Sequence, residues 1–352
     1  MNPRFLLLVP AAALSLAVRA EVVKTWDKPL APDMTFRMEV EENPPRTIYG
    51  IKFDPKIVRA ESWLAGGSIY ETGASNGRAI VSQMVKETGA QAGFNGDFFQ
   101  WTPDPGGDPS GFMASKGVLL SAEGKGARTA AWVWGSGSPG RIIRPKAEIT
   151  ALSGLITMPI DSLNGKVAQG GMGLSFDVAG EVYGHGPLSV VHMKLTSGRP
   201  GLTGDLEAEV IRVEAGVTRT AIAKGTAVLA AEAEKAAQLS ALLPGSKVAI
   251  KVTVTGLREG ETEAMGGGPI LLRKGEYAGP AEDEKAQRHP RTLVGTTPEG
   301  MVWSILVDGR QTMSVGTTHT ESAEILRRWG CTEAINLDGG GSSTLHALGV
   351  TL

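Results

Sequence analysis

The chain has 352 residues, with 35 Lys and Arg against 37 Asp and Glu, and a net charge of -2 at pH 7. This length is enough for a sizeable core in one large or two ordinary domains. The charges are mixed in sign and form no basic block, which argues against a nucleic-acid partner. The 47 glycines and few aromatic residues favour many turns over a helical bundle.

The first twenty residues are typical of a signal peptide. Arg4 gives a short positive region, Phe5–Val18 is apolar, and Val18-Arg19-Ala20 offers small residues for cleavage before Glu21. The apolar run is shorter than the roughly 20 residues of a spanning helix, so cleavage is favoured over a retained anchor. We therefore expect residues 21–352 to be exported by a bacterial route, secreted or periplasmic, with no stable membrane span.

Periodicity of apolar residues predicts the elements of the first part of the chain. A strand pair is expected over 34–64, because apolar and polar residues alternate there. A helix is expected over 76–88, with Gly89 as its stop, followed by a strand and turn over Gln91–Phe99. Residues 101–111 are rich in Pro and Gly and predict a loop.

The second part of the chain is dominated by short β-like runs from 117 to 223. An alanine-rich helix is expected over 226–243, then a strand over Lys247–Thr255. The last helix is expected over 317–329 and the last clear strand over 333–338. The sequence predicts an α+β fold with a mixed or antiparallel sheet flanked by a few helices. It also predicts one domain over 21–352, with 150–255 as a possible β-rich subdomain.

A glycine-rich run after the last predicted strand carries the densest polar chemistry of the chain. Strand alternation places Asn336 and Asp338 on one face, pointing toward a loop with many N–H and O–H donors. The loop residues are Gly339, Gly340, Gly341 and Ser342. Such a loop fits a sugar, a phosphate or a metal. The alternative is a turn whose Asp caps its own backbone.

The same pattern occurs earlier in the chain, after the first predicted helix. Asn95 and Asp97 follow Gly89 at the spacing at which Asn336 and Asp338 follow Gly330. We hypothesise that the two segments lie near each other and that both Asn-x-Asp pairs line one cleft. The alternative is coincidence, because this is common turn chemistry.

Three further segments carry candidate binding groups. Backbone amides near Gly267 and Gly268 are suited to an anion, or else to a tight entry into a strand. Arg291 and Arg310 offer planar guanidinium groups that match phosphate oxygens. His289 is either a general acid or base, or a surface histidine before a proline.

Thr318 and Glu321 have the spacing of a capping box at the start of the last helix. The capping role explains Glu321, and a catalytic role facing the cleft is the alternative. Cys331 is the only cysteine, and we expect a buried, inert thiol. No structural zinc motif is present, while calcium or magnesium bound by Asp97, Asp338 and carbonyl oxygens is an open alternative.

Taken in order, these motifs resemble the phosphodiester glycosidase family, from about residue 35 to the end. The matching segments are Asn95-Gly-Asp-Phe-Phe99, Met265-Gly-Gly-Gly-Pro-Ile-Leu-Leu272, His289-Pro-Arg-Thr292, Asp308-Gly-Arg310, Glu321-Ser-Ala-Glu-Ile-Leu326 and Asn336-Leu-Asp-Gly-Gly-Gly-Ser-Ser343. One departure is Asp97, where the family usually has a second glycine.

The resemblance implies hydrolysis of a sugar-1-phosphodiester at the anomeric C–O bond, giving free sugar and a phosphomonoester. In that reaction Arg291 and Arg310 would neutralise charge on the departing phosphate, and Asp338, Glu321 or Asp97 would supply the carboxylate. No cofactor is expected, apart from the open question of a divalent cation. The alternatives are a non-catalytic module that binds exopolysaccharide or phosphate-containing glycan, and a metal-dependent phosphodiesterase that cleaves P–O.

Overall fold

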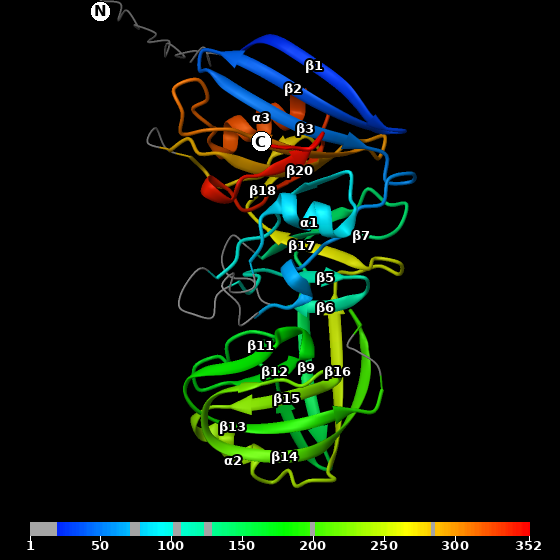
Figure 1. The fold of residues 1–352 in the computed structure, drawn as a ribbon, viewed down its shortest axis with the longest axis vertical. Helices are drawn as coiled ribbons and strands as arrows, with labels where there is room; N and C mark the ends of the chain where they lie inside the picture. The colour runs from blue at the N-terminus through cyan, green and yellow to red at the C-terminus, as the bar shows by residue number, and fades with distance from the viewer. Residues whose placement is uncertain (1–19, 71–77, 101–106, 123–128, 198–200, 283–285) are drawn as a thin grey trace, which may run out of the picture.

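The computed structural model describes residues 20–70, 78–100, 107–122, 129–197, 201–282 and 286–352. Within these residues the strands form four sheets, arranged along the long axis of the molecule (Figure 1). Residues 1–19 of the expected leader lie outside the described residues. Residues 101–106 of the expected loop also lie outside them.

The first sheet carries the glycine-rich run and most of the candidate site. Its eight strands are each antiparallel to their neighbours. In order across the sheet they are β1 (Glu21–Ala31), β2 (Met34–Glu42), β3 (Arg46–Phe53), β21 (Val302–Val307), β20 (Arg291–Thr296), β22 (Glu333–Asn336), β18 (Ile270–Arg273) and β19 (Glu276–Tyr277). Helix α3 (His319–Arg328) packs on one face, where Ala323, Ile325 and Leu326 meet buried residues of β20 and β21.

Two small sheets cover the other face of the first sheet. The larger contains β6 (Val118–Ser121), β5 (Met113–Ser115), β17 (Glu263–Gly267), β7 (Ala130–Trp134) and β8 (Arg141–Ile143). The smaller contains β24 (Val350–Thr351), β23 (Leu345–Ala347) and β4 (Ala92–Phe94), with helix α1 (Val81–Thr88) packed against it. Trp132 of β7 and Leu345 of β23 share one core with Val294 and Ile335 of the first sheet.

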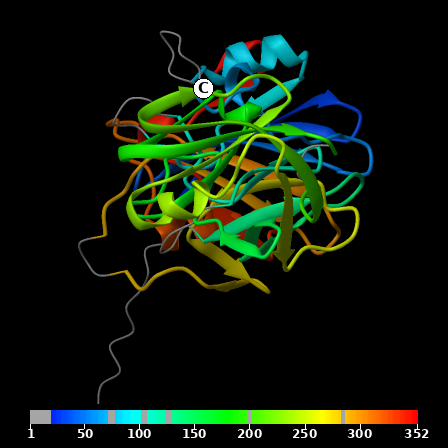
Figure 2. The same cartoon turned by 90° about the horizontal axis from the view of Figure 1, so that it is seen from below.

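Residues 146–255 supply a second eight-stranded sheet at the other end of the long axis (Figure 1). Its order is β10 (Ile156–Pro159), β9 (Lys146–Ser153), β16 (Lys247–Thr255), β14 (Gly204–Ala221), β13 (Glu181–Leu195), β15 (Thr226–Ala231), β12 (Met172–Phe176) and β11 (Ser162–Leu163). Figure 2 shows these strands curving around their interior. Their core extends to Ala131 and Val133 of the neighbouring sheet. That this region is a subdomain stays a prediction.

The fold is mostly β, with 49% strand and 11% helix, which corrects the α+β expectation. One cause is the run 226–243, which forms strand β15 and only the short helix α2 (Ala233–Leu239). Ala227 and Ala230 pair with β12 and β13 and are fully buried. A small side chain that fits between two strands outweighs the helix propensity of alanine here. Strand β1 was not expected from the sequence.

Several local predictions are confirmed. Strands β2 and β3 pair over the expected region, and helix α1 ends at Gly89 in a left-handed conformation. Cys331 is buried, and this burial raises the pKa of its thiol to about 12. As a separate observation, the described residues contain no helix that is long and apolar enough to cross a membrane.

Candidate functional site

The segment that begins strand β20 lies against the start of helix α3. The His289 N–H donates to the Thr317 carbonyl at 3.1 Å, and the Thr317 N–H donates back to the His289 carbonyl at 3.0 Å. The Arg291 Nε also donates to the Thr317 carbonyl, at 3.2 Å. These contacts bring His289 and Arg291 beside His319, the first residue of α3.

An open pocket of about 520 Å³ forms at this junction. Its lining residues are Pro280, Ala281, Glu282, Ala286, Gln287, His289, Arg291 and His319. The volume lies in the range of sites for small molecules, which is typically about 300–1,000 Å³. Two predicted residues, His289 and Arg291, therefore line one pocket together with Glu282 and His319.

Positive charge comes from the half-buried guanidinium group of Arg291 in the pocket and from an exposed one beside it. Burial lowers the pKa of Arg291 from its usual value, while Glu282 acts in the opposite direction. Arg310 is exposed, and its Nη2 lies 3.5 Å from the His289 Nδ1. The two arginines thus flank His289, which suits an anionic ligand group.

Both histidines of the site favour the neutral state. Burial and the neighbouring charges of Arg291 and Arg310 lower the pKa of His289. Burial, Arg291 and His289 lower the pKa of His319 to about 4, although Glu282 opposes the shift. A neutral imidazole donates from one ring nitrogen and accepts at the other, so both residues are suited to hydrogen bonding with a ligand.

Glu282 fixes one wall of the pocket to the N-terminus of α3. Its Oε1 accepts hydrogen bonds from the backbone N–H groups of His319 and Thr320, and lies 3.7 Å from the His319 Nδ1. Burial alone would raise the pKa of Glu282, but hydrogen bonds from Thr320, Thr318 and the backbone hold it below its usual value. The carboxylate therefore stays charged at neutral pH. No motif in the sequence pointed to Glu282.

The glycine-rich loop lies against the other side of the arginines. The Gly340 N–H donates to the Pro290 carbonyl at 3.0 Å, and a Cβ on Gly339 would lie 2.9 Å from the same oxygen. A Cβ on Gly340 would lie 3.1 Å from the Arg310 Nη2. The glycines therefore allow the loop to approach the segment that carries His289 and Arg291. Gly341 and Ser342 continue the loop as a short 3₁₀ turn.

Asp338 begins this loop, and the earlier Asn-x-Asp segment runs beside it. The Asn95 Nδ2 donates to the Asp338 carbonyl at 2.8 Å, and the Asp338 N–H donates to the Gly96 carbonyl at 3.0 Å. The two segments are therefore neighbours, as hypothesised. The Asp338 Oδ1 accepts from the Gly339 N–H at 2.9 Å, so this Asp does cap its own turn.

That both Asn-x-Asp pairs line one cleft stays a prediction. Asp97 turns its carboxylate toward the backbone of Gly111 and Gly266, where an added Cβ would lie 2.5 and 2.4 Å from Oδ2. Asn336 is 2% exposed, and its amide donates to the Gly268 and Leu337 carbonyls. Its Oδ1 has no hydrogen-bond partner among the described residues. Neither side chain is among the residues that line the pocket, and the same holds for Asp338.

Gly267 and Gly268 lie at the tight strand entry that was the alternative interpretation of this segment, and anion binding by them stays a prediction. The Gly268 N–H donates to the Asn336 carbonyl at 2.8 Å, so this amide is already used. A Cβ on Gly267 would lie 2.6 Å from the same carbonyl oxygen. The absence of a side chain therefore lets this segment pass directly beside strand β22.

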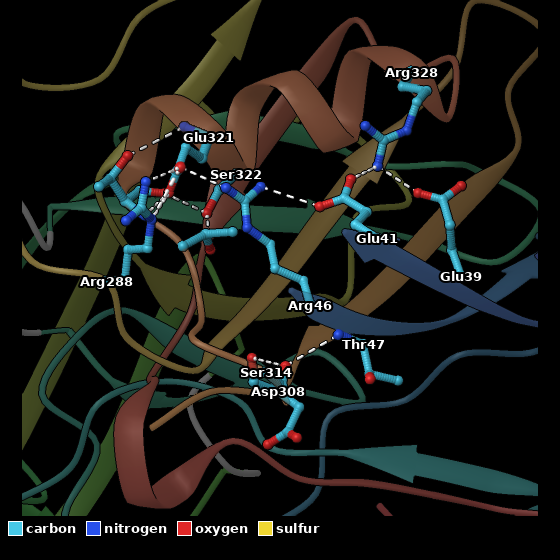
Figure 3. A network of polar contacts seen from close by, with 12 residues as sticks. Glu39, Glu41, Arg46, Thr47, Arg288, Asp308, Ser314, Glu321, Ser322 and Arg328 are labelled. Carbon is cyan, nitrogen blue, oxygen red and sulfur yellow. Dashed lines mark hydrogen bonds and ion pairs between the residues drawn. The ribbon is translucent and has the colours of Figure 1, made fainter. Parts of the chain in front are cut away.

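Glu321 belongs to an ion-pair network and not to the pocket (Figure 3). It forms the predicted capping box with Thr318, and its carboxylate also binds Arg46 and Arg288. Arg46 continues to Glu41, which with Glu39 binds Arg328 near the other end of α3. These partners account for the position of the Glu321 carboxylate, and its catalytic role stays a prediction.

No group of three or more His, Cys, Asp or Glu residues suited to a metal ion occurs in the part of the chain that the structure describes. In this part the open pocket instead collects arginine, histidine and one carboxylate. The fold is therefore a β framework with a pocket whose guanidinium group can bind an anionic group.

Part of the chain matches a family of known proteins. Residues 202–351 match the phosphodiester glycosidase family. The match includes His289, Arg291, Arg310 and Asp338, and it confirms the resemblance inferred from the ordered motifs. A comparison with curated proteins gives no match.

Two solved structures show a similar fold, and a third aligns with a lower score. A hypothetical protein from Synechocystis aligns with a TM-score of 0.74 at 16% identity, over 95% of this chain and 64% of its own. A Burkholderia pseudomallei protein described as a candidate exported protein aligns with a TM-score of 0.69 at 21% identity, over 88% and 70%. The catalytic domain of zebrafish N-acetylglucosamine-1-phosphodiester alpha-N-acetylglucosaminidase gives 0.47 at 18%, over 94% and 79%. The chain thus spans about two thirds of the length of the Synechocystis protein.

Proposed function

We propose that this protein hydrolyses sugar-1-phosphodiesters, such as esters of N-acetylglucosamine-1-phosphate, at the anomeric C–O bond. The observation that carries the proposal is the pocket with Arg291 and His289, beside Arg310, within the region that matches the phosphodiester glycosidase family. One guanidinium group in the pocket and a second one beside His289 suit a phosphate group.

In the proposed reaction, the oxygen of a water molecule bonds to the anomeric carbon. The bond between that carbon and the phosphate oxygen breaks, and its electron pair leaves with the phosphomonoester. Negative charge therefore grows on the phosphate in the transition state, where Arg291 and Arg310 stabilise it most. The proton of the water passes to a base and then to solvent.

Asp338 is the carboxylate that we assign to this reaction. It begins the loop that lies against Arg310 and the segment of Arg291, and the Asn95 amide holds its carbonyl oxygen. A carboxylate at this position either activates the water or stabilises positive charge on the sugar. Glu321 is not used, because Arg46 and Arg288 occupy its carboxylate.

Product analysis in water enriched in ¹⁸O tests the proposal. The protein without its leader is incubated with a methyl ester of alpha-N-acetylglucosamine-1-phosphate, and the products are followed by phosphorus and proton NMR. We expect free sugar that carries the label and methyl phosphate that does not. Label in the phosphate would instead establish P–O cleavage. Unchanged substrate that still binds would support the non-catalytic glycan-binding alternative.

We also propose that the protein is exported. The charged, apolar and small-residue regions of its first twenty residues support this, as does the description of the Burkholderia pseudomallei neighbour as a candidate exported protein. Expression of the full chain, followed by cell fractionation and N-terminal sequencing, should give a periplasmic or extracellular protein that begins at Glu21. An uncleaved protein in the membrane fraction would contradict the proposal.

A further inference from the structure

The pocket has two chemically different sides. On one side the glycine-rich loop lies against Arg310, which lies 3.5 Å from His289. On the other side Glu282 lines the pocket, with Arg291 between the two. A phosphate that binds both arginines therefore has the glycine-rich loop on one side and the Glu282 carboxylate on the opposite side.

This layout divides the substrate between the two sides. The proposed reaction needs the anomeric carbon near Asp338, which begins the glycine-rich loop. The sugar then occupies the loop side of the phosphate. The alcohol half of the diester, which leaves with the phosphate, occupies the side that Glu282 and His319 line.

Glu282 is held in place as an anion. Its side chain is 16% exposed, and two backbone N–H groups at the N-terminus of α3 bind its Oε1. A helix N-terminus favours a negative charge. Because His319 favours the neutral state, Glu282 keeps a net negative charge on this side of the pocket.

We propose that Glu282 selects sugar phosphodiesters whose alcohol half is neutral or cationic next to the phosphate, and rejects those that carry a second anionic group there. This inference rests on the proposed function. A hydroxyl or ammonium group donates hydrogen bonds to the carboxylate, whereas a carboxylate or a second phosphate is repelled by it. Specificity of this kind comes from repulsion as much as from attraction. Sugar esters of simple alcohols and amino alcohols are the substrate class that fits, and nucleoside diphosphate sugars are excluded.

Three diesters of alpha-N-acetylglucosamine-1-phosphate test the inference, with ethanolamine, ethylene glycol and glycolate as the alcohols. Their chains are similar in length and differ mainly in the terminal charge. We expect kcat/KM to fall from ethanolamine to ethylene glycol to glycolate. The glycolate carboxylate would lie close to the Glu282 carboxylate, and the two like charges repel each other. We therefore expect kcat/KM for the ethanolamine diester to exceed that for the glycolate diester by about tenfold or more.

Glu282→Gln is the decisive variant, because its amide oxygen still accepts hydrogen bonds from the His319 and Thr320 N–H groups. We expect it to bring the three kcat/KM values within about threefold of each other, since the charge that separates them is gone. Glu324→Gln, on the exposed side of α3, is the matched control and should keep the wild-type order. An unchanged order in Glu282→Gln, or no preference in the wild type, would overturn the proposal.

A binding measurement separates this proposal from the proposed function. If the wild type hydrolyses none of the diesters, calorimetry gives the affinities of the three compounds for wild type and Glu282→Gln. Suppose that the wild type binds the ethanolamine diester most tightly and the glycolate diester most weakly, and that Glu282→Gln binds all three equally. Selection by Glu282 would then be supported even though the hydrolysis proposal had failed. Equal affinities in the wild type would overturn the selection itself.

Discussion

At the scale of single residues, the two arginines of the site differ in how firmly they are held. Arg291 is half-buried and bound to the Thr317 carbonyl, whereas Arg310 is exposed and has a positive φ of 62°. Non-glycine residues with positive φ are uncommon. A fixed guanidinium group stabilises a charged transition state without reorganisation, so Arg291 should contribute more than Arg310.

Replacement of each arginine by lysine tests this difference. Arg291→Lys keeps the charge but loses the planar pair of donors, and we expect kcat/KM to fall about 100-fold. Arg310→Lys should cost less, because an exposed guanidinium group is already free to move. Steady-state kinetics on one phosphodiester gives kcat/KM for each variant and for the wild type. An equal loss in the two variants would contradict the proposed division of roles.

Asp338→Asn tests the assigned carboxylate. Its amide oxygen still accepts from the Gly339 N–H, so the turn is expected to remain. We expect activity to be abolished while the far-UV circular dichroism and the melting temperature stay as in the wild type. Turnover near the wild-type rate by a folded Asp338→Asn protein would remove this residue from the mechanism.

His319 should make the protein more sensitive to acid. Its pKa is about 4 in the folded protein, against an ordinary value of 6.5 for histidine. The unfolded chain therefore binds more protons here between these values, and the contribution of His319 to stability falls as pH drops from 6.5 to about 4. Its charged or titratable neighbours are Arg291, His289 and Glu282.

Urea unfolding at pH 7 and pH 4.5 measures this effect. We expect His319→Gln to lose less stability than the wild type between the two pH values. The exposed His185→Gln is the control and should behave as the wild type. If His319→Gln loses as much stability as the wild type, the histidine is not held neutral in the folded protein.

At the scale of elements, helix α3 is fixed at both of its ends. Glu321 binds Arg46 and Arg288 near the N-terminus, and Arg328 binds Glu39 and Glu41 near the C-terminus (Figure 3). Arg46 and Glu41 are almost fully buried. The network therefore holds α3, and with it His319, against strands β2 and β3.

Glu321→Gln separates a structural role from a catalytic one. The variant can keep the capping box but loses the charge that pairs with Arg46, so we expect the free energy of unfolding to fall by about 2–4 kcal/mol. Because the side chain does not line the pocket, kcat of the folded variant should stay within about threefold of the wild type. The exposed Glu324→Gln should change neither value. Loss of kcat with unchanged stability would return Glu321 to the mechanism.

The sequence predicted elements whose signals are local. The capping box of α3, the helix stop at Gly89 and the β2–β3 pair all depend on residues a few positions apart. The run 226–243 was predicted wrongly, because its first part is a strand only through pairing with β12 and β13. Tertiary pairing of this kind overrides propensity and has no local signal.

In the candidate site, too, contacts between distant parts of the chain could not be predicted from local sequence. The segments that contain His289, Arg291, Arg310 and the glycine-rich run lie against one another. Glu282 was missed because its partner is a helix N-terminus 37 residues further along the chain, and no motif surrounds it. Asp97 and Glu321 carry a carboxylate in the right motifs, but only the packing shows where each carboxylate points.

At the scale of the whole molecule, the second sheet is joined to the rest through its core. The chain enters it at β9 and leaves at β16, where Lys146 pairs with Thr255. The core of this sheet continues to Ala131 and Val133 outside it. Because the apolar contacts cross the boundary, we expect the two parts to unfold together.

Equilibrium unfolding in urea checks this cooperativity. All seven tryptophans lie outside residues 146–255, so their fluorescence reports the remainder of the molecule. Far-UV circular dichroism reports the strands of both parts. We expect the two signals to give one transition with the same midpoint. A separate transition in circular dichroism alone would show that residues 146–255 unfold independently.

The lone, buried Cys331 has a practical consequence for how this protein is produced. With one cysteine in 352 residues, no intramolecular disulfide contributes to its stability. Its thiol is 2% exposed and favours the protonated form, so it reacts slowly with oxidants or with a second thiol. The same folded protein should therefore be obtained from a reducing cytoplasm and from an oxidising culture medium.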